Sequence, residues 1–543
     1  MLRIAAVTVA LTPLLLAAQG DTVFMIQIDG ARYSVVDTLY RQGKLPGMKR
    51  LIRDKKGVLL RAVTSFPSST APSLPELMVG RYSDRCQPDL LRRVQGFDRE
   101  SGQIARYEFE RKAWDTRDVD LFDLVAQQGR RSFSYFEGEF RSASVNDFNP
   151  LTYRVEFATG YANLPTVNYD RQVIDEVLRD LRAEKPPPGL VFVGLGAADI
   201  NGHARSPDGP EYAQAIVEND AQLQRLIAAL EKIEHPKGNS VYQHSHFFIY
   251  GDHGMVSTSQ HLNLGRSLNQ AGILAADGAD LGAMLQASLV KDWYKNVDAV
   301  ILGIGSNIAE LQVRRRTPAG KRRPWRERPS LIELRSFPVA TGRGTVDLIA
   351  LLTGHVGMDL VLIPEAAGRV QVFAPGGGEG LVVRQDPVNG PRRFAYQVRR
   401  IDGLGRDPLG YLQDDGARAL VTPAKAELLQ FHDEADWLTA TAQTARPYAP
   451  PLIPKAFDVG PTAPDIIVTS KNGFGFLPVV RGDHGNLTSE SMVSFLLVAS
   501  PELESGVGDG QTVRLIDAHA EVRHLLELPA DPLTDSRGLA ATK

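Results

Sequence analysis

The sequence predicts an α/β fold, in which a mostly parallel β-sheet carries helices on both faces and is interrupted by an inserted α+β cap. Short apolar runs of strand length recur along the chain and indicate buried strands. Segments with the apolar spacing of amphipathic helices lie between these runs. Strands that alternate with helices of this length typically form parallel sheets covered on both faces.

Each predicted element of the core follows from its apolar pattern. Strands are expected at residues 23–28, 190–195, 247–250 and 492–498. Helices are expected at residues 35–52, 172–181, 211–233 and 518–526. The helix at 172–181, for example, places Val173, Val177 and Leu181 on one face, and the prolines at 186–188 end it before the next strand.

The sequence pattern changes at residues 262–464, where many turn-forming residues separate shorter strand-like runs. This region is expected to form the inserted cap, so that the core comprises residues 21–261 and 465–543. A basic cluster lies at residues 314–328. Pro318 and Gly320 within it favour a solvated loop over a surface that grips a polyanion.

The overall charge is nearly balanced, with 61 Lys and Arg residues, 64 Asp and Glu residues and a net charge of −3. The chain therefore has no overall electrostatic field that would attract nucleic acid or an anionic membrane. No nucleic-acid-binding surface is evident, and any specificity for anions must come from local groups of side chains. The single cysteine, Cys86, excludes an intramolecular disulfide.

The first twenty residues are typical of a cleavable secretory signal. Arg3 precedes an uncharged apolar run at residues 4–18, and small residues follow. The mature chain is expected to begin at Gln19 or Asp21, without a transmembrane anchor, in the periplasm or outside the cell. A membrane anchor is the alternative, but the run is short for a span of about 20 residues.

Metal-binding and nucleophilic side chains occur in five short segments, each where a predicted strand ends or a helix is about to begin. They are Asp29, Thr70, Asp199 with His203, Asp252 with His253, and His484. Ligands collect at the carboxyl ends of the strands in open parallel sheets. Together these side chains offer ligands for two transition-metal ions and one hydroxyl nucleophile, which suits displacement at phosphorus or sulfur.

Thr70 lies in a hydroxyl-rich segment ahead of an expected helix. Pro72 and Pro75 suit a first turn, and Ser73 with Glu76 has the spacing of a capping box. A hydroxyl at a helix amino terminus can meet a phosphate-like anion, although plain N-capping explains the same residues.

The Asp and His pairs are each weak signals alone. Asp199 and His203 are four residues apart and can face one ion, and Gly202 permits a tight path between them. Asp252 and His253 are adjacent, so both can bind one ion only if the chain bends there. The order in which all the segments occur makes them informative together.

In that order the segments resemble those of the alkaline phosphatase superfamily, and most nearly its type I nucleotide pyrophosphatase/phosphodiesterase branch. That branch has an Asp after the first strand, then Phe-Pro-x-x-Thr, Asp-x-x-Gly-His, Asp-His-Gly-Met and a final His-Gly. The matching positions here are Asp29 and residues 66–70, 199–203, 252–255 and 484–485. The resemblance covers nearly all of the core but not the insertion in detail.

The resemblance implies two zinc sites with three protein ligands each, with manganese or iron as alternative ions. The ligands of one site are Asp199, His203 and His484, and those of the other are Asp29, Asp252 and His253. Thr70 would lie beside the second ion as the nucleophile. An exported hydrolase of phosphodiester or pyrophosphate bonds, or of phosphomonoesters, is then expected. It would act on a small phosphorylated substrate through a phosphothreonine intermediate.

Two positions leave questions open. The branch commonly has Asn three residues after the nucleophile, where it contacts a phosphoryl oxygen, and this chain has Ser73. A serine hydroxyl still donates a hydrogen bond, but over a shorter reach, so the orientation of the substrate stays open. Asp483 is a further candidate ligand or ligand-orienting residue.

Other functions share part of this pattern. Sulfatases have Cys-x-Pro-x-Arg, or Ser in place of Cys, at the nucleophile, and Thr70 cannot become formylglycine. Phosphoryl-group transferases such as the phosphoethanolamine transferases use threonine but typically carry several membrane helices and disulfides. A non-catalytic exported metal-binding protein is the third alternative. The natural substrate, the choice between diester and monoester, and the oligomeric state stay open.

Overall fold

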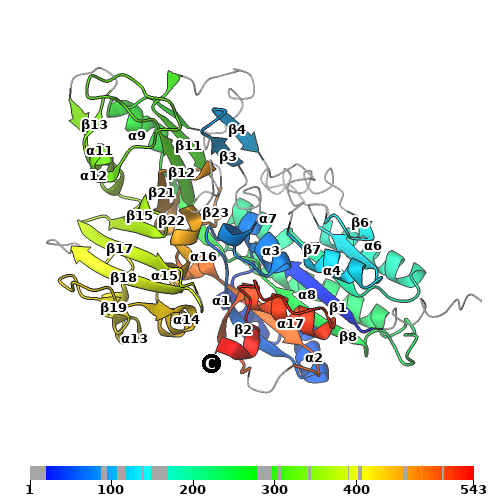
Figure 1. Ribbon diagram of the computed structural model, residues 1–543. Coiled ribbons are helices and arrows are strands. Elements are labelled where there is room, and N and C mark those ends of the chain that lie inside the picture. The colour runs from blue at the N-terminus through cyan, green and yellow to red at the C-terminus, as the bar shows by residue number, and fades with distance from the viewer. Residues whose placement is uncertain are drawn as a thin grey trace, which may run out of the picture.

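Two β-sheets organise the structure (Figure 1). The computed structural model describes residues 20–86, 95–106, 118–136, 140–147, 169–277, 296–303, 305, 307–339, 344–388, 390–400, 406–457, 462–477, 480–503 and 507–542. Within these residues the central sheet has eight strands and the second sheet has ten. In Figure 1 the second sheet lies to the left of and above the central one.

The central sheet is mostly parallel, as predicted. Its order is β25-β2-β24-β8-β1-β7-β5-β6. The strands are β1 (Thr22–Ile28), β2 (Val58–Val63), β5 (Ser132–Tyr135), β6 (Val145–Asn146), β7 (Leu190–Leu195), β8 (Ser245–Tyr250), β24 (Val493–Ala499) and β25 (Thr512–Arg514). Among these strands only β24 runs antiparallel to its neighbours, β2 and β8.

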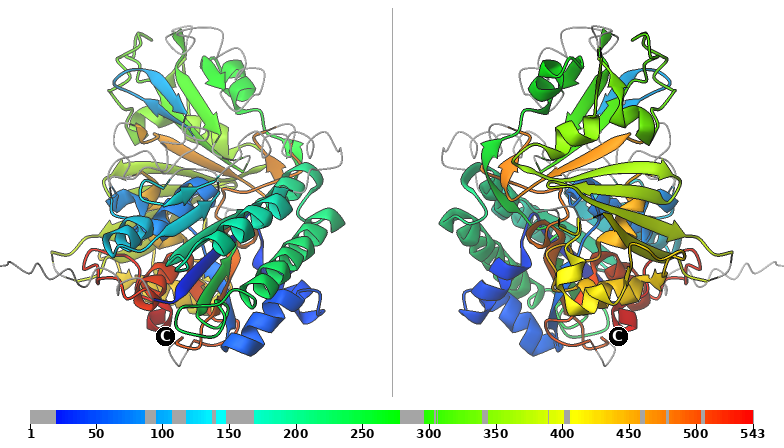
Figure 2. Two further views of the ribbon diagram at one scale, coloured as in Figure 1. Left: turned by 90° about the vertical axis from the view of Figure 1, so that its right-hand side faces the viewer. Right: turned by 90° about the vertical axis from the view of Figure 1, so that its left-hand side faces the viewer.

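Helices cover both faces of the central sheet, which confirms the predicted fold class. On one face, Phe24 and Ile26 of β1 pack in a core with α1 (Tyr33–Arg41), α2 (Pro46–Lys55), α6 (Tyr169–Ala183) and α8 (Pro210–Leu230). On the other face, Val23 and Met25 pack with α3 (Thr70–Val79), α4 (Leu121–Gln127) and α17 (Ala518–Leu525). The left view of Figure 2 looks onto the face with the long helices α6 and α8. Burial on both faces explains why β1 is apolar at nearly every position.

The amphipathic stretch at residues 35–52 is two helices, not one. α1 ends at Arg41, Gly43 adopts a φ of +73°, and Pro46 begins α2. Glycine enters the left-handed region without strain, and proline suits a first helical turn because the N–H it lacks would be unpaired there. The apolar spacing predicted the buried faces but not the break between them.

The second sheet is built mainly from residues 262–464. Its strands are β10 (Ala275–Asp277), β11 (Ala299–Gly303), β12 (Ile308–Val313), β15 (Met358–Ala366), β16 (Arg369–Ala374), β17 (Gly378–Gln385), β18 (Arg393–Arg400), β19 (Val421–Thr422), β20 (His432–Asp433) and β21 (Ile466–Ser470). Its order is β10-β11-β12-β21-β15-β16-β17-β18-β19, and β20 also pairs with β18. The associated helices are α9 (Leu264–Gln270), α11 (Leu331–Arg335), α12 (Leu348–Thr353), α13 (Asp415–Arg418), α14 (Glu434–Thr441) and α15 (Ala449–Leu452). The region is therefore α+β, and its exact boundaries stay a prediction.

Smaller elements lie outside the two large sheets. β9 (Val256–His261) pairs with β22 (Gly473–Gly475) and β23 (Gly482–Asp483), and two hairpins join β3 (Gln95–Asp98) to β4 (Gln103–Arg106) and β13 (Phe337–Pro338) to β14 (Thr345–Val346). Two short helices are α7 (Ala197–Arg205) and α16 (Ser489–Met492). The 3₁₀ turns are η1 (Ser83–Arg85), η5 (Tyr411–Gln413), η6 (Pro454–Phe457), η8 (Leu515–Asp517) and η9 (Leu539–Thr542).

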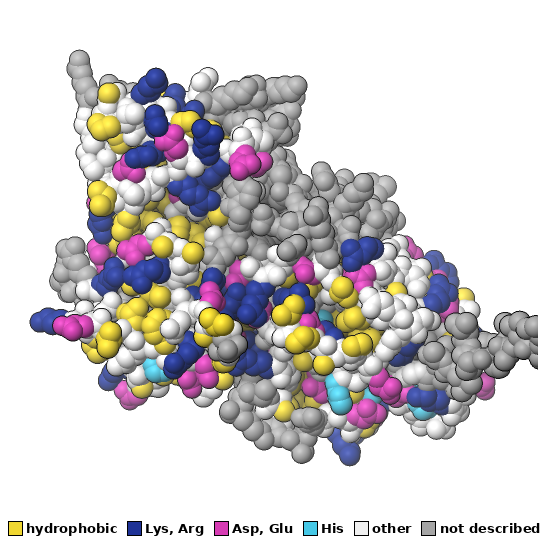
Figure 3. Space-filling model, viewed as in Figure 1, with side chains coloured by type: hydrophobic (Ala, Val, Ile, Leu, Met, Phe, Trp, Pro, Cys, Tyr) yellow, Lys and Arg dark blue, Asp and Glu magenta, His cyan; other side chains and the backbone are white. Residues whose placement is uncertain are grey.

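Positive and negative side chains are interspersed on the face drawn in Figure 3. Arg316 and Arg322 of the basic cluster both contact Asp298, and Arg315 contacts Glu333. These arginines are thus committed to local ion pairs. The part of the chain that the structure describes holds no helix long and apolar enough to cross a membrane. The expected signal sequence, residues 1–20, lies outside the described residues except for Gly20.

Candidate metal centre

The predicted site residues converge at the carboxyl ends of the central strands. Asp29 follows β1, Asp252 follows β8, and Asp199 lies in α7, which follows β7. β1 is parallel to both β7 and β8, so these three ends meet at one edge of the sheet. Thr70 begins α3, and His484 arrives from much later in the chain, directly after β23.

The six candidate ligands fall into two groups of three. One group is Asp199, His203 and His484, and the other is Asp29, Asp252 and His253. In each group, one ligand atom from every residue lies within 4.8 Å of the others, and all six residues are buried. The rings of His253 and His484 stack with their centroids 3.8 Å apart, so the two groups adjoin.

Distances inside the groups match those between ligands of one ion. His203 Nε2 lies 3.2 Å from Asp199 Oδ2. His253 Nε2 lies 3.4 Å from Asp29 Oδ1 and 3.5 Å from Asp252 Oδ2. Two ligand atoms on a tetrahedral zinc ion, with bonds of about 2.0 Å, are roughly 3.3 Å apart.

Backbone carbonyls orient the three histidines. The Nδ1 atoms lie 2.9 to 3.0 Å from carbonyl oxygens, those of Gly482 for His203, Gly254 for His253 and Ser68 for His484. A carbonyl oxygen only accepts, so a neutral imidazole here carries its proton on Nδ1 and directs the Nε2 lone pair into its group. Histidines that bind metals in proteins are typically fixed in this way.

Two carboxylate oxygens have no hydrogen-bond donor. Asp199 Oδ1 and Asp252 Oδ2 are buried, and no described residue donates to either. The other oxygen of Asp252 accepts from Gly30 N at 3.1 Å, which fixes the side chain with Oδ2 on the side of His253. Burying such an oxygen without a partner is unfavourable, and a divalent cation would satisfy it. The ligand set therefore fits ions of the zinc class.

The electrostatic field in the first group attracts positive charge. Burial lowers the pKa of His203, but the negative charges of Asp199 and Asp483 outweigh burial and raise the pKa to about 10. For His484, in contrast, burial dominates and holds the pKa well below its ordinary value. A proton or a metal ion would balance the negative charge of Asp199 and Asp483 in this group.

Thr70 lies against the second group. Its Oγ1 is 3.4 Å from Asp29 Oδ1 and 3.3 Å from His253 Nε2. α3 begins at Thr70, after Ser69 in extended conformation as the N-cap. The hydroxyl therefore lies at a helix amino terminus, where unpaired amides and the helix dipole favour an anion.

The predicted capping box of Ser73 and Glu76 is wrong, because both residues lie inside α3. Glu76 instead accepts hydrogen bonds from the Ser65 hydroxyl and from Ser83 N, the latter at 2.7 Å. It thereby connects α3 to the segments on either side of it. The Ser73 hydroxyl lies 3.5 Å from the Thr70 carbonyl oxygen, within the helix.

Asp199 and His203 lie one turn apart on α7, which puts both side chains on one face. The expected tight path at Gly202 is thus a helical turn. Glycine is needed there for a different reason: a Cβ atom on Gly202 would lie 2.3 Å from the sulfur of Met255. Close packing of α7 against the segment after β8 therefore depends on Gly202.

Asp483 touches the first group without joining it. Its Oδ1 accepts from His484 N at 2.8 Å, and it lies 3.8 Å from His203 Nδ1 and 3.7 Å from His484 Nε2. This position suits orientation of the two histidines more than direct ligation.

Sequence reasoning missed the residue that anchors α7. Asp170 of α6 accepts from Gly196 N at 2.8 Å, from Ala197 N at 3.3 Å and from Asn219 Nδ2 at 2.5 Å. Gly196 is the N-cap of α7, so Asp170 supplies from a distance the acceptor that a capping side chain normally provides. No sequence spacing links Asp170 to α7, which begins 27 residues later.

Replacing Asp170 with Asn should lower the free energy of unfolding by about 1 to 3 kcal/mol. The amide has one acceptor oxygen where the carboxylate has two, so at least one of the three donors loses its partner. Urea denaturation measures the effect. Asp175→Asn, on the exposed side of α6, is the matched control and should change stability by less than about 0.5 kcal/mol. Equal midpoints for the two variants would contradict the anchoring role.

Comparison with known proteins places the chain in a family. Residues 23–324 match the family described as type I phosphodiesterase / nucleotide pyrophosphatase. The matched range includes Thr70 and every candidate ligand except His484. An uncharacterised pyrophosphatase/phosphodiesterase of Schizosaccharomyces pombe is 26% identical over 287 residues, which are 50% of this chain and 53% of the relative. The alignment thus spans about half the length of that relative.

Solved structures extend the likeness to both sheets. Murine ectonucleotide pyrophosphatase / phosphodiesterase 5, as an inactive variant in complex with AMP, has a TM-score of 0.52 at 14% identity, over 96% of this chain and 97% of that one. The human protein of the same name has a TM-score of 0.52 at 13% identity, over 95% and 97%. At such identities the likeness is one of fold. Because the family match covers more than half of the 543 residues, the chain belongs to the type I phosphodiesterase / nucleotide pyrophosphatase family.

Proposed function

We propose that this protein is a metal-dependent hydrolase that cleaves phosphodiester or pyrophosphate bonds of small phosphorylated substrates, with Thr70 as the nucleophile. The proposal rests on the position of the Thr70 hydroxyl. This hydroxyl contacts Asp29 and His253 and lies at the amino terminus of α3. Family membership supports the reaction class. The AMP bound to the murine relative favours a nucleotide as the substrate.

The two groups of ligands would each hold one zinc ion. Asp199, His203 and His484 form the first site, and Asp29, Asp252 and His253 form the second. Such ions, when bound, lower the pKa of a coordinated hydroxyl or water and stabilise negative charge on phosphoryl and leaving-group oxygens. The carbonyl-bound Nδ1 atoms and the two unpaired carboxylate oxygens support this assignment.

Thr70 would carry out the chemistry in two displacements. In the first, Thr70 Oγ1 gives up its proton and forms a bond to phosphorus while the bond to the leaving oxygen breaks and that oxygen takes up a proton, which gives phosphothreonine and the free leaving group. In the second, water attacks phosphorus from the side that the leaving group vacated, and Thr70 is released as the free hydroxyl. Unpaired amides in the first turn of α3 would orient the phosphoryl oxygens. Ser73, one turn into the helix, is proposed to contribute to substrate binding.

We also propose that the chain is exported to the periplasm or secreted. The support is the pattern of residues 1–20, in which one basic residue precedes a short apolar run and small residues. The absence of an intramolecular disulfide is compatible with export because the two sheets bury extensive cores of their own.

Metal analysis and an activity assay test the proposal together. Purified protein should hold about two zinc ions per chain in this centre and should hydrolyse bis(4-nitrophenyl) phosphate. A chelator should abolish turnover, and added Zn²⁺ should restore it. Protein that is folded yet refuses zinc and lacks turnover would overturn the proposal. Equal or faster hydrolysis of 4-nitrophenyl phosphate would overturn only the preference for diesters.

A further inference from the structure

A third group of ligand-type side chains lies at the opposite edge of the central sheet. Asp21 directly precedes β1, His246 is the second residue of β8, and Glu502 follows β24. These strands are neighbours in the order β24-β8-β1, and β24 is antiparallel to β8, so its end meets the starts of the other two. At about 3.3 Å per strand residue, this group lies roughly 20 Å or more from Asp29 and Asp252.

The geometry of this group resembles that of the candidate metal centre. One ligand atom from each of Asp21, His246 and Glu502 lies within 4.8 Å of the others. His246 Nε2 is 3.5 Å from Asp21 Oδ2, and the distances from His253 Nε2 to its two carboxylates are 3.4 and 3.5 Å. The imidazole and the carboxylate are thus spaced like two ligands of one ion, for which roughly 3.3 Å is expected.

The buried ring of His246 is held by the same turn that carries Glu502. His246 is 2% exposed, and its Nδ1 lies 2.8 Å from the Ser500 hydroxyl. The Ser500 hydroxyl oxygen also accepts from Glu502 N at 3.1 Å. When Nδ1–H donates to Ser500, the Nε2 lone pair faces Asp21, which is the arrangement that protein metal sites use to fix a histidine.

Asp21 divides its two oxygens between different neighbours. Oδ1 lies 2.8 Å from Lys237 Nζ and 3.4 Å from His244 Nδ1. Oδ2 faces His246 instead. Lys237 therefore fixes the carboxylate through Oδ1 and leaves Oδ2 directed toward His246.

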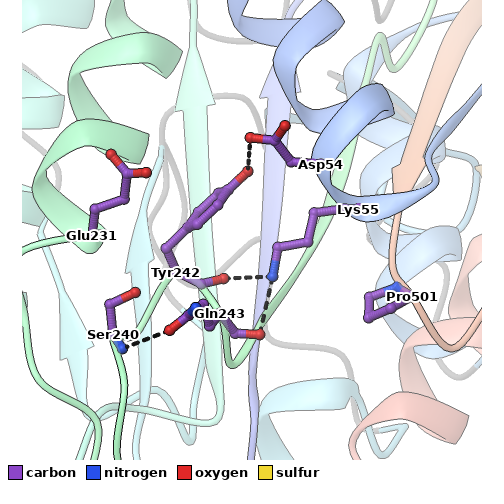
Figure 4. A pocket seen from close by; sticks show the side chains of 7 residues that line it. All are labelled: Asp54, Lys55, Glu231, Ser240, Tyr242, Gln243 and Pro501. Carbon is purple, nitrogen blue, oxygen red and sulfur yellow. Dashed lines mark hydrogen bonds between the residues drawn. The ribbon is translucent and has the colours of Figure 1, made fainter.

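Glu502 is exposed, so the group opens to solvent on one side. Its neighbour Pro501 lines a cavity of about 660 Å³ beside the group (Figure 4). Lys55 Nζ, which also lines the cavity, donates to the carbonyl oxygens of Tyr242 and Gln243 at 2.6 and 3.0 Å. These two carbonyl oxygens thus hold the Lys55 ammonium group in the wall of the cavity. No residue of the candidate metal centre lines the cavity, so the two regions are separate.

We propose that Asp21, His246 and Glu502 form a third site, which binds a divalent transition-metal ion of the zinc class. Two carboxylates and one imidazole suit such an ion, and water would complete its coordination. The site contains no nucleophile and lies far from Thr70, so its role is structural. An ion here ties the starts of β1 and β8 to the turn after β24.

Zinc titration of the tag-free full-length protein tests this proposal. After loading with Zn²⁺ and gel filtration, elemental analysis should find one zinc ion fewer per chain in Glu502→Gln than in the wild-type protein. His246→Asn should lose the same single ion. Zn²⁺ should raise the Tm of the wild-type protein by about 3 °C more than that of Glu502→Gln. Hydrolysis by Glu502→Gln should be unchanged.

His244→Asn is the matched control, because His244 contacts the oxygen of Asp21 that the proposed site does not use. It should keep the wild-type zinc content. Glu502 is exposed, so its substitution tests the site even if the buried His246→Asn variant fails to fold. Equal zinc in wild-type and Glu502→Gln protein, or equal losses in Glu502→Gln and His244→Asn, would overturn the third site. The readout is a difference between variants, so it stands even if the two-zinc assignment of the catalytic centre fails.

Discussion

Replacement of Thr70 by alanine should reduce kcat for bis(4-nitrophenyl) phosphate by at least about 1000-fold, because loss of a covalent nucleophile typically costs that much or more. The Thr70 hydroxyl is in contact with Asp29 and His253, and the neighbouring hydroxyls are placed differently. Ser68, for example, is fully buried and is bound to Asn486 O and the Ser491 hydroxyl. Steady-state kinetics measures kcat, and elemental analysis of the same preparation measures the zinc content.

Two variants separate the nucleophile from the fold around it. Thr70→Ser keeps a hydroxyl at the start of α3 and should retain measurable turnover. Ser69→Ala changes the N-cap, whose side chain makes no capping hydrogen bond, and should stay within a few-fold of the wild-type kcat. Mass spectrometry of rapidly quenched wild-type reactions should find phosphate on Thr70. Thr70→Ala protein with two bound zinc ions and undiminished turnover would exclude Thr70 as the nucleophile.

The Glu434→Gln variant should lose about 3 to 5 kcal/mol of unfolding free energy, because it leaves the buried Lys455 without its counterion and removes one of the two carboxylates paired with Arg514. Glu434 begins α14, beside the second sheet, and contacts Lys455 Nζ at 2.9 Å and Arg514 Nη1 of β25 at 2.6 Å. All three side chains are buried. This cluster joins the inserted region to the central sheet, so the loss should appear in the cooperative unfolding of both.

The effect should also depend on pH. Burial opposes ionisation of Glu434, but the charges of Lys455 and Arg514 outweigh burial and lower its pKa to about 2. A lowered pKa contributes stability that is fully present above the unfolded value of 4.5 and is lost as the pH falls toward 2. The difference in urea midpoint between wild type and Glu434→Gln should therefore shrink from pH 7 to pH 3. The exposed control Glu427→Gln should match wild type at both pH values, and a pH-independent gap would contradict the ion-pair explanation.

The elements of the central sheet were predictable where burial controls the sequence. β7 occupies the predicted residues, and β1 and β8 extend their predictions by one or two residues, because a strand buried on both faces must be apolar almost throughout. The site followed from the same logic, since polar side chains directly after such strands must lie at one edge of the sheet.

Features that depend on distant partners were not predictable from local patterns. The break between α1 and α2 could be predicted only from Gly43 and Pro46 taken together. Glu76 binds Ser65 and Ser83, which are outside its helix, and does not cap α3. Asp170 acts on a helix that begins 27 residues later. Asp21 and Glu502 are almost a whole chain apart, so only the fold brings them together.

β24 lies between β2 and β8 although the ribosome makes it long after both. A nascent chain that ends before residue 484 leaves the edges of β2 and β8 unpaired in the middle of the sheet and lacks His484 as well. Unpaired edges of this kind invite aggregation, so we expect the growing chain to depend on chaperones until translation is nearly complete. The same late stretch supplies the missing strand and the last candidate ligand, and prematurely terminated products should therefore be both unstable and inactive.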